Sequence, residues 1–477
     1  MTMTTTKRTR PELQGKRVLV VGAARSGLAI AGFCAAQGAE VTLTDKKPAD
    51  ALGVTLPAGV RLEAGGHVAA SFAAAEIIVL SPGVPPRTLP EAQAAAARGA
   101  WVTGEIELAA RFIDPAAAFI GITGTNGKST TTALAGAIAA LTGRPTFTGG
   151  NLGEPLTTCL GTPAAARGGI VVCELSSYQL ETADELHPRA AALLNVTPDH
   201  LDRYVDMAAY AAAKGRVFLR QNALDWAIYN ADDPACEPEA RRGGGIPYPF
   251  SSAPGRELPR GAFLVPGARG RDLVLRWTDG AGASHEHVMA EHDLPLVGTH
   301  NLENIMAAAL CVLAVGATPA HIDAGTAAFR PLPHRMELVG EVGDVRYYDD
   351  SKGTNVGAVV KALDGFPRPV VLIAGGRDKG GDYGPMRDAL APIARAAVLI
   401  GEATDKIAAS LAGAAYPIER AASMEDAVRA AQRLARPGDA VVLSPACSSF
   451  DMFKNFEHRG QVFRLAVRSL PESKSPA

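Results

Sequence analysis

Short apolar runs and longer amphipathic segments alternate along most of the chain. The runs at 17–22, 77–80, 119–122 and 170–175 have the length and uniform hydrophobicity of strands that are buried on both faces. Helical patterns follow the first and third of these runs, at about 25–37 and 133–140. Strands that alternate with helices predict an α/β fold built on parallel sheets.

The pattern divides into three successive α/β units. At 477 residues the chain is too long for one hydrophobic core. A break at Asp114-Pro115 and the Pro-rich stretch 329–333 suggest the boundaries, so we predict domains over 1–108, 109–331 and 332–477. Residues 237–295 are rich in Pro, Gly and Arg, with short alternating runs, and predict a small β-rich excursion inside the second unit.

Composition excludes several classes of protein. Lys plus Arg is 47 and Asp plus Glu is 49, so the formal charge of −2 gives no electrostatic case for nucleic acid as the main partner. No apolar run reaches the length of a membrane span, and the polar residues 1–10 read as a tail without the apolar core of a signal peptide. The six cysteines form no CxxC pair, which favours free thiols in a reducing cytoplasm.

The strongest chemical signal is the stretch Gly124-Thr-Asn-Gly-Lys-Ser129 between a buried strand and a helix. Glycines there let backbone N–H groups approach an anion, Lys128 supplies positive charge, and the Ser129 hydroxyl can join a Mg²⁺ shell. The usual spacing places another glycine at position 122, where this chain has Ile122. The alternative is a glycine turn before an ordinary surface lysine.

Five further polar residues end or follow predicted strands or lie on predicted helices. Glu174 ends a strand and is suited to orient Mg²⁺ or its water, although a structural carboxylate is the alternative. His200 suits a metal ligand or a phosphate donor, but a lone histidine is more often structural. Lys214 alone would be a solvated helix lysine. Asn301 and Asn304 lie one helical turn apart and can face one ligand.

The N-terminal unit opens as a Rossmann-like βαβ, with Gly22-Ala-Ala-Arg-Ser-Gly27 after the first strand and Asp45 ending the second. An acid at that point suits a ribose and favours a dinucleotide-dependent oxidoreductase. Ala24 at the middle glycine position crowds a pyrophosphate, so another nucleotide, or none, stays open. The oxidoreductase reading leaves the loop around Lys128 unexplained, and a non-catalytic nucleotide-binding scaffold is a second alternative.

Two other groups of polar residues have patterns that suggest a site. His285, His287 and His292 suggest a metal cluster, but no flanking Cys or carboxylate set completes such a site. The third unit carries polar loops after its predicted strands, at 350–355, 375–382 and 444–451. Strand ends of doubly wound sheets are where ligands bind, so these loops predict a second site.

Taken in order, the motifs resemble the signature of the ATP-dependent Mur ligases. The motifs are Gly124–Ser129, Glu174-Leu-Ser-Ser, Asn195-Val-Thr-Pro-Asp-His200, His300-Asn-Leu-Glu-Asn304, His334-Arg335 and Asp350-Ser-Lys352. The N-terminal unit, Gly375-Gly-Arg-Asp-Lys379 and Ser444-Pro-Ala-Cys-Ser-Ser449 resemble the members that add D-glutamate to UDP-MurNAc-L-Ala. The resemblance covers essentially the whole chain.

The resemblance implies a Rossmann-like UDP-substrate domain, a P-loop-type central ATPase domain and a Rossmann-like amino-acid domain, in a cytoplasmic monomer. It also implies an acyl-phosphate reaction driven by ATP, with two Mg²⁺ ions. Lys128, Glu174, His200 and Lys214 would be catalytic, with Ser129, Glu174, His200 and the carbamate of Lys214 as metal ligands. ATP would contact Gly124, Thr125, Asn126, Gly127, Lys128, Ser129, Thr130, Asn301, Arg335, Asp350 and Lys352.

The same resemblance implies the remaining contacts. The UDP-substrate would meet Arg25, Ser26, Asp45, Lys46, Lys47, Gly83 and Asn151. D-Glutamate would meet Thr354, Lys379, Ser449, Phe450 and Phe456. A pocket for its two carboxylates requires fixed positive charge and hydroxyl or N–H donors, with no acid beside the side-chain carboxylate.

Overall fold

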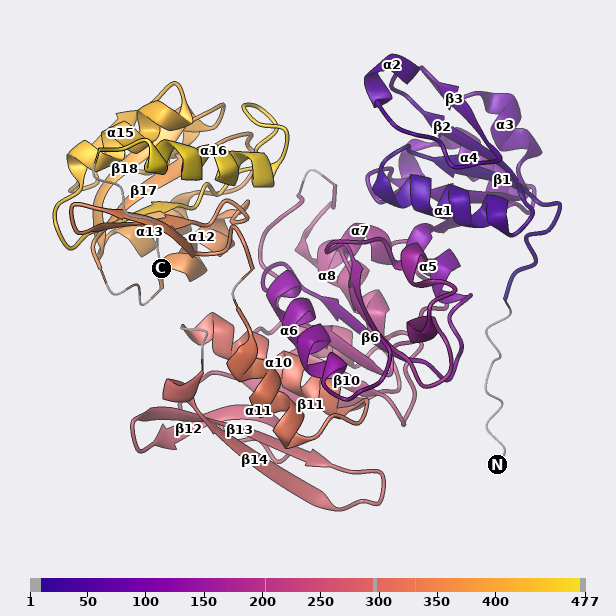
Figure 1. Cartoon of the computed structure of the whole chain (residues 1–477), viewed down its shortest axis with the longest axis horizontal. Helices are drawn as coiled ribbons and strands as arrows, with labels where there is room; N and C mark the ends of the chain where they lie inside the picture. Colours follow the sequence, from indigo (N-terminus) through magenta and orange to yellow (C-terminus); the bar gives the residue numbers. More distant parts are fainter. Residues whose placement is uncertain are drawn as a thin grey trace. The chain divides into compact units, whose positions relative to one another are not determined.

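Three sheets organise the protein, as Figure 1 shows for a computed structural model of the chain. The structure describes residues 10–201, 203–294, 298–330, 332–364, 366 and 368–471. Residues 1–9 of the predicted N-terminal tail therefore lie outside the described residues. Position 331, where the second domain was predicted to end, also lies outside them.

The first sheet has five parallel strands in the order β3-β2-β1-β4-β5. Its strands are β1 (Arg17–Val21), β2 (Glu40–Asp45), β3 (Val60–Ala64), β4 (Ile77–Leu80) and β5 (Trp101–Gly104). The accompanying helices are α1 (Arg25–Ala36), α2 (Ala49–Leu52), α3 (Ala69–Ala74), the 3₁₀ turn η1 (Pro86–Thr88), α4 (Pro90–Ala97) and α5 (Glu105–Ala110). Side chains of α1 fill the core on one face, and side chains of α3 and α4 fill the other.

The second sheet has nine strands in the order β14-β13-β12-β11-β10-β9-β6-β8-β7. They are β6 (Ala118–Thr123), β7 (Thr146–Gly150), β8 (Ile170–Glu174), β9 (Ala190–Leu193), β10 (Trp226–Asn230), β11 (Ile246–Ser251), β12 (Gly261–Gly267), β13 (Gly270–Thr278) and β14 (Ser284–Ala290). The strands from β7 to β12 pair in parallel, and β12, β13 and β14 pair antiparallel. The antiparallel end is the β-rich excursion predicted from the composition of 237–295.

The helices of the second sheet include the one that follows the glycine-rich loop. They are α6 (Lys128–Ala140), α7 (Ser177–Leu180), α8 (Met207–Gly215), α9 (Cys236–Ala240), α10 (Thr299–Leu313) and α11 (Pro319–Ala328), with 3₁₀ turns η2 (Leu156–Cys159), η3 (Pro163–Ala165), η4 (Arg216–Phe218) and η5 (Glu291–Asp293). Most of α10 is buried, and α11 packs against α6.

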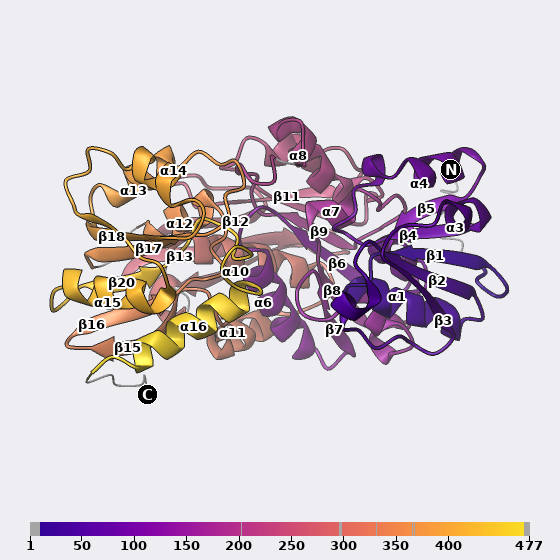
Figure 2. The ribbon, with the colours of Figure 1, turned by 90° about the horizontal axis from the view of Figure 1, so that it is seen from above.

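The third sheet has six strands in the order β15-β16-β20-β17-β18-β19, antiparallel only between β15 and β16. They are β15 (Glu337–Val342), β16 (Val345–Asp349), β17 (Val370–Gly375), β18 (Ala394–Ile400), β19 (Ile418–Arg420) and β20 (Ala440–Leu443). The helices are α12 (Val356–Leu363), α13 (Gly384–Leu390), α14 (Thr404–Ser410), α15 (Met424–Leu434) and α16 (Phe456–Arg468). Figure 2 shows α15 and α16 on one face, with α12, α13 and α14 on the other.

Chain contacts group the residues into two compact units. The first unit contains 1–196, 210–295 and 301–329, and the second contains 197–209, 296–300 and 330–477. Residues 197–209 therefore belong with the third sheet, although their sequence lies within the predicted central domain. The three α/β units confirm the predicted fold class. Among the described residues, none of the helices has both the length and the hydrophobicity needed to cross a membrane.

Candidate active site

The loop from Gly124 to Ser129 connects β6 to α6, as predicted, and its shape depends on two glycines. Gly127 has φ of +85°, and a Cβ there would lie 2.3 Å from Asn304 Oδ1. Gly124 has φ of +152°, and a Cβ there would lie 2.9 Å from the Cβ of Leu194. Both positions therefore require glycine, because a larger residue would combine backbone strain with a collision.

Two lysines converge on one carbonyl of this loop. Lys128 Nζ donates to Gly124 O at 2.9 Å and to Thr125 O at 2.8 Å. Lys214 Nζ donates to the same Gly124 O at 2.7 Å and lies 4.4 Å from the ring centre of Tyr210. Lys214 is 1% exposed, so it is not the solvated helix lysine of the simpler interpretation. Two lysine side chains therefore meet at one carbonyl, and basic side chains at a glycine-rich loop suit a polyanion.

Asn195 fixes the loop from the neighbouring strand end. Its main-chain oxygen accepts from Thr125 N at 2.9 Å. Its side chain accepts from Asn126 N at 2.8 Å and donates to Asn126 O at 3.1 Å. The sequence analysis placed Asn195 only within a motif, although its position directly after a buried strand was the signal that could have found it.

Glu174 and Asn151, predicted for different ligands, are in direct contact. Asn151 Nδ2 donates to Glu174 Oε1 at 2.6 Å, and Asn151 N donates to Glu174 O at 2.9 Å. Glu174 is 1% exposed, and its Oε2 accepts no hydrogen bond from the described residues. A buried carboxylate oxygen without a donor is suited to a cation. The donor set of Glu174 and the Ser129 hydroxyl therefore fits Mg²⁺ in its chemistry.

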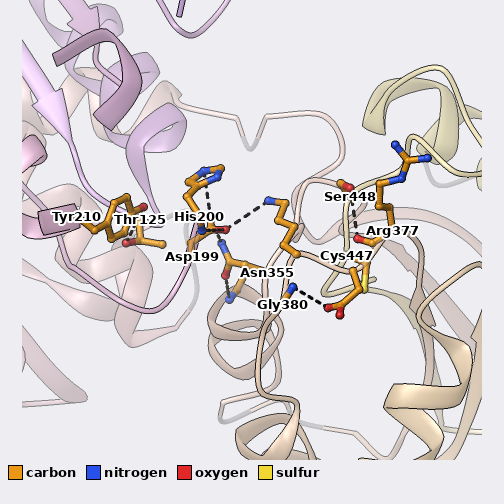
Figure 3. Close-up of polar contacts among 12 residues, drawn as sticks. Thr125, Asp199, His200, Tyr210, Asn355, Arg377, Gly380, Cys447 and Ser448 are labelled. Atoms are coloured by element: carbon orange, nitrogen blue, oxygen red, sulfur yellow. Dashed lines mark hydrogen bonds and ion pairs between the residues drawn. The ribbon is translucent and has the colours of Figure 1, made fainter. Parts of the chain in front are cut away.

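The other predicted nucleotide contacts of the first unit lie on α6 and α10 or in the loop between β6 and α6. Thr130 is buried in α6, and the Thr125 hydroxyl donates to Tyr210 Oη at 3.4 Å, as Figure 3 shows. Asn301 Oδ1 accepts from Asn304 Nδ2 at 3.3 Å, and Asn304 Oδ1 accepts from the Thr131 hydroxyl at 3.1 Å. The structure thus joins the two asparagines of α10 to the loop and helix that carry Lys128.

The predicted UDP contacts lie in the first unit, and two of them already have partners. Asp45 accepts from Ala23 N at 2.8 Å and from Lys47 N at 2.9 Å, so its carboxylate holds the turn together. Arg25 Nη1 donates to Gly153 O at 2.5 Å, in the segment that also carries Asn151. The four remaining residues are on or near the carboxyl ends of strands or at the start of α1: Ser26, Lys46, Lys47 and Gly83.

The second unit holds a buried cluster around Asp350. The Ser444 hydroxyl donates to Asp350 Oδ2 at 2.6 Å. Burial raises the pKa of Asp350 to about 7, against smaller opposing effects of Ser444 and the nearby Arg335. His334 Nδ1 contacts Asp349 Oδ2 at 2.6 Å, and this hydrogen bond raises the pKa of His334. The predicted residues Arg335 and Asp350 are therefore brought close together.

His334, Asp349 and Glu337 place three ligand-type atoms within 4.8 Å of one another, the only such group among the described residues. A Cβ at position 460 would lie 2.2 Å from His334 Nδ1 and 2.6 Å from Asp349 Oδ2, so helix α16 packs directly on the pair. Glu337 is already paired with Arg464 at 2.8 Å through both oxygens. We therefore interpret His334, Glu337 and Asp349 as a structural cluster and not as a metal site. His285 and His287 instead contact separate carboxylates, of Asp279 and Asp323.

Four of the five predicted glutamate contacts lie near the loops of the third sheet. Lys352 Nζ lies 3.7 Å from the ring centre of Phe456, the first residue of α16, so this predicted glutamate contact has a cation against its ring. Thr354 N donates to Lys352 O at 2.8 Å. Ser449 is buried, whereas Phe450 is 64% exposed.

The fifth, Lys379, meets a residue that the prediction did not include. Lys379 Nζ lies 3.4 Å from Asp199 Oδ1, and Asn355 Nδ2 donates to Asp199 Oδ2 at 3.0 Å. Figure 3 shows Asp199 beside His200 and Asn355. His200 Nε2 lies 3.7 Å from Asp199 Oδ2. His200 belongs to the second unit, so the structure does not test whether it joins Glu174 and Lys214 at a metal.

Left-handed backbone conformations gather in these loops. Among the described non-glycine residues only five have positive φ, and four of them are His200, His334, Met336 and Ala446. Ala446 N donates to Gly353 O at 2.9 Å, which joins the 444–451 loop to the 350–355 loop. Strained backbone that persists in a folded protein tends to cluster at functional sites. The second unit therefore has the features of a binding site at the strand ends.

Comparison with known protein families matches all three parts of the chain. Residues 16–104 match the Mur ligase MurD-like N-terminal domain. Residues 122–312 match the Mur ligase middle domain, and residues 334–447 match the Mur ligase glutamate ligase domain.

Full-length relatives agree with these matches. The UDP-N-acetylmuramoylalanine--D-glutamate ligase of Geotalea daltonii is 45% identical over 96% of this chain and 98% of its own length. The ligase of the same name from Anaeromyxobacter dehalogenans is 46% identical over 95% of this chain and 98% of its own length. The crystal structure of the MurF ligase from Thermotoga maritima in complex with ADP shares the fold at 16% identity, with a TM-score of 0.57, over 95% of this chain and 96% of that one. The chain therefore belongs to the Mur ligase family.

Proposed function

We propose that this protein is an ATP-dependent ligase that joins D-glutamate to UDP-N-acetylmuramoyl-L-alanine in peptidoglycan precursor synthesis. The observation that carries the proposal is the glycine-rich loop with Lys128 Nζ on Gly124 O and Thr125 O, which follows the strand position, Ile122, that pairs with the buried Glu174. Near full-length identity of 45% to a curated ligase of that name supports the choice of substrates.

The reaction has two steps. The terminal carboxylate of the UDP-substrate attacks the γ-phosphorus of ATP, and ADP leaves as the acyl phosphate forms. The neutral amine of D-glutamate then attacks the acyl carbon, and the C–O bond to phosphate breaks as the amide forms. Both steps bring anions together, so the protein must supply positive charge and exclude water.

Lys128 and the N–H groups of the loop hold the ATP phosphates in this proposal. Gly124, Thr125, Asn126, Gly127, Ser129, Thr130 and Asn301 are the other nucleotide contacts of the first unit. Asn195 keeps the loop in the shape that presents these groups, since it bonds both Thr125 and Asn126. Arg335, Asp350 and Lys352 are proposed nucleotide contacts from the second unit.

Ser129, Glu174, His200 and Lys214 would hold two Mg²⁺ ions, which neutralise phosphate charge and orient the reacting oxygens. Glu174 supports this assignment because its Oε2 is buried and accepts no hydrogen bond from the described residues. Lys214 would contribute as a carbamate, formed when its neutral amine adds to CO₂ and loses a proton. That change replaces an ammonium group beside Gly124 O with an anion.

The UDP portion would bind to Arg25, Ser26, Asp45, Lys46, Lys47 and Gly83, and the muramoyl tail would reach Asn151. D-Glutamate would bind to Thr354, Lys379, Ser449, Phe450 and Phe456. We further propose that the protein acts as a monomer in the cytoplasm. Its six cysteines are free and buried, which suits a reducing compartment.

The test is phosphate release from ATP in the presence of UDP-MurNAc-L-Ala and one amino acid at a time. The panel contains D-glutamate, L-glutamate, D-aspartate and meso-diaminopimelate. We expect release that depends on both the UDP-substrate and D-glutamate, with the amide product seen by mass spectrometry. Release that needs no amino acid, or that prefers another member of the panel, contradicts the proposal.

A further inference from the structure

Asp199 is the one carboxylate that contacts the predicted glutamate lysine among the described residues. It follows β9 in the sequence but belongs to the second unit. Its Oδ1 lies 3.4 Å from Lys379 Nζ and accepts from His200 N at 2.9 Å. Its Oδ2 accepts from Asn355 Nδ2 at 3.0 Å. The carboxylate is therefore held in a fixed orientation, and its side chain is only 7% exposed.

Asn355 is itself held rigidly. Its Oδ1 accepts from Ala358 N at 2.8 Å and caps the first turn of α12. The same amide donates its Nδ2 to Asp199, so it links the start of α12 to the Asp199 carboxylate. Thr354, a predicted contact of the glutamate, directly precedes this residue. Asp199 is thus part of the arrangement around Thr354 and Lys379.

An acid in a pocket for a dicarboxylate needs an explanation, because it repels the substrate's carboxylates. An α-amino acid, however, carries an ammonium group and a carboxylate on the same carbon. A site that binds this head group must present an anion and a cation side by side, and Asp199 and Lys379 do so at 3.4 Å. The cation alone would not distinguish an amino acid from a simple diacid.

We propose that Asp199 binds the α-ammonium group of the incoming amino acid, while Lys379 binds one of its carboxylates. This inference rests on the proposed function and extends it to how the substrate amine is recognised. The pair Asp199–Lys379 separates slightly as the amino-acid head group takes its place between the two side chains. Asn355 keeps the carboxylate in position during this exchange.

Asp199 acts on binding, not on the attack. The ammonium form is the one that Asp199 attracts, whereas the neutral amine is the nucleophile, so a proton must be lost after binding. Removal of the carboxylate charge should therefore raise KM for D-glutamate more than it lowers kcat.

The experiment compares D-glutamate with glutarate, which has both carboxylates and no amine. KM for D-glutamate and the competitive Ki of glutarate are measured for the wild type and for Asp199→Asn. We expect wild type to prefer D-glutamate, and Asp199→Asn to reduce that preference about 10-fold or more, as for loss of one charge pair. Ki for glutarate should stay the same or fall, because a repulsion has been removed.

Two control variants are measured in the same way. Lys379→Gln should weaken D-glutamate and glutarate by similar factors, because both ligands lose a carboxylate partner. Asp388→Asn removes an exposed charge of α13 that pairs with the exposed Arg387, so it should leave both constants within about 2-fold. Thermal melts confirm that each variant is folded.

The inference is wrong if Asp199→Asn changes both constants by the same factor, since Asp199 would then only position Lys379. It is also wrong if wild type binds glutarate as tightly as D-glutamate, a result that needs no variant. Failure of the proposed function looks different, because wild type would then release no phosphate in response to D-glutamate.

Discussion

Lys128 and Lys379 are both proposed to meet substrate anions, but their surroundings are assembled in different ways. Lys128 bonds two carbonyls that lie three and four residues before it. Lys379 meets Asp199, which lies 180 residues away in the sequence. Most of the nucleotide region around Lys128 therefore comes from one contiguous segment of the chain, whereas the amino-acid region around Lys379 is formed by loops that are distant in the sequence.

The largest effect is expected at the contiguous site. Lys128→Ala should lower kcat about 10³-fold or more, because a preorganised charge on the transferring phosphate is lost. The melting temperature should move by only a few degrees, because Gly124 O keeps its bond to Lys214. Phosphate release assays and a thermal melt measure the two quantities. Near-normal turnover of the variant would contradict the assignment of Lys128 to the ATP phosphates.

Lys214→Ala should lower activity about 100-fold, because a proposed metal-binding carbamate is lost. A small carboxylic acid such as formate in the buffer should restore part of that activity, since it supplies a carboxylate in the space that the side chain leaves. Lys214→Arg is the control, because it keeps positive charge but cannot form the carbamate. Ordinary activity in the alanine variant would return Lys214 to a structural role.

The second unit contains a buried carboxyl group, that of Asp350, whose charge state should change near neutral pH. The pKa of Asp350 is about 7 in the folded protein and 3.8 without burial, so the folded state binds the extra proton between these values. The free energy of unfolding that protonated Asp350 contributes is present at low pH, and it is lost as the pH rises through 7. Between pH 6 and pH 8, wild type should lose about 1 kcal/mol relative to Asp350→Asn.

Urea unfolding of wild type and Asp350→Asn at several pH values measures this difference. Comparing the two proteins cancels the titration of every group that they share. Parallel stability curves would mean that Asp350 keeps an ordinary pKa in the folded protein.

The smallest effect concerns the contact between Lys352 and Phe456. Phe456→Leu keeps an apolar surface but removes the aromatic ring under the ammonium group, which is worth about 0.5–1 kcal/mol. We expect activity to fall about 3-fold, and Phe456→Tyr to retain it. Equal losses in both variants would indicate a packing effect instead of the cation–ring contact.

The sequence analysis predicted the strand, the glycine-rich turn and the helix around Lys128, which the structure contains, but it did not predict the contact between Lys379 and Asp199, for a physical reason. A strand, a glycine-rich turn and a helix follow one another in the chain, so the geometry around Lys128 could be read from local order. Asp199 approaches Lys379 only because residues 197–209 pack with the third sheet, which no local pattern reveals. The same limit applies to Asn151 and Glu174, whose contact joins the loop after β7 to the last residue of the neighbouring β8.

Other features depended on side-chain partners that a sequence does not show. Asp45 stays a predicted nucleotide contact, and the structure adds two partners that the sequence does not show, because its oxygens accept from Ala23 N and Lys47 N. The buried state of Lys214 could not be separated from a solvated one by its position in an Ala-rich helix. Fold class was accessible because it depends on the order of elements, which hydrophobic periodicity reports directly.

Steady-state kinetics of Lys379→Ala test most directly the claim that the two regions bind different substrates, ATP in one and D-glutamate in the other. Removal of a charged partner from a substrate carboxylate should raise KM for D-glutamate roughly 30-fold or more. KM for ATP should change less than about 2-fold, because Lys379 is not among the proposed ATP contacts and Lys128 with its loop belongs to the other unit. A rise in KM for ATP with an unchanged KM for D-glutamate would contradict the account.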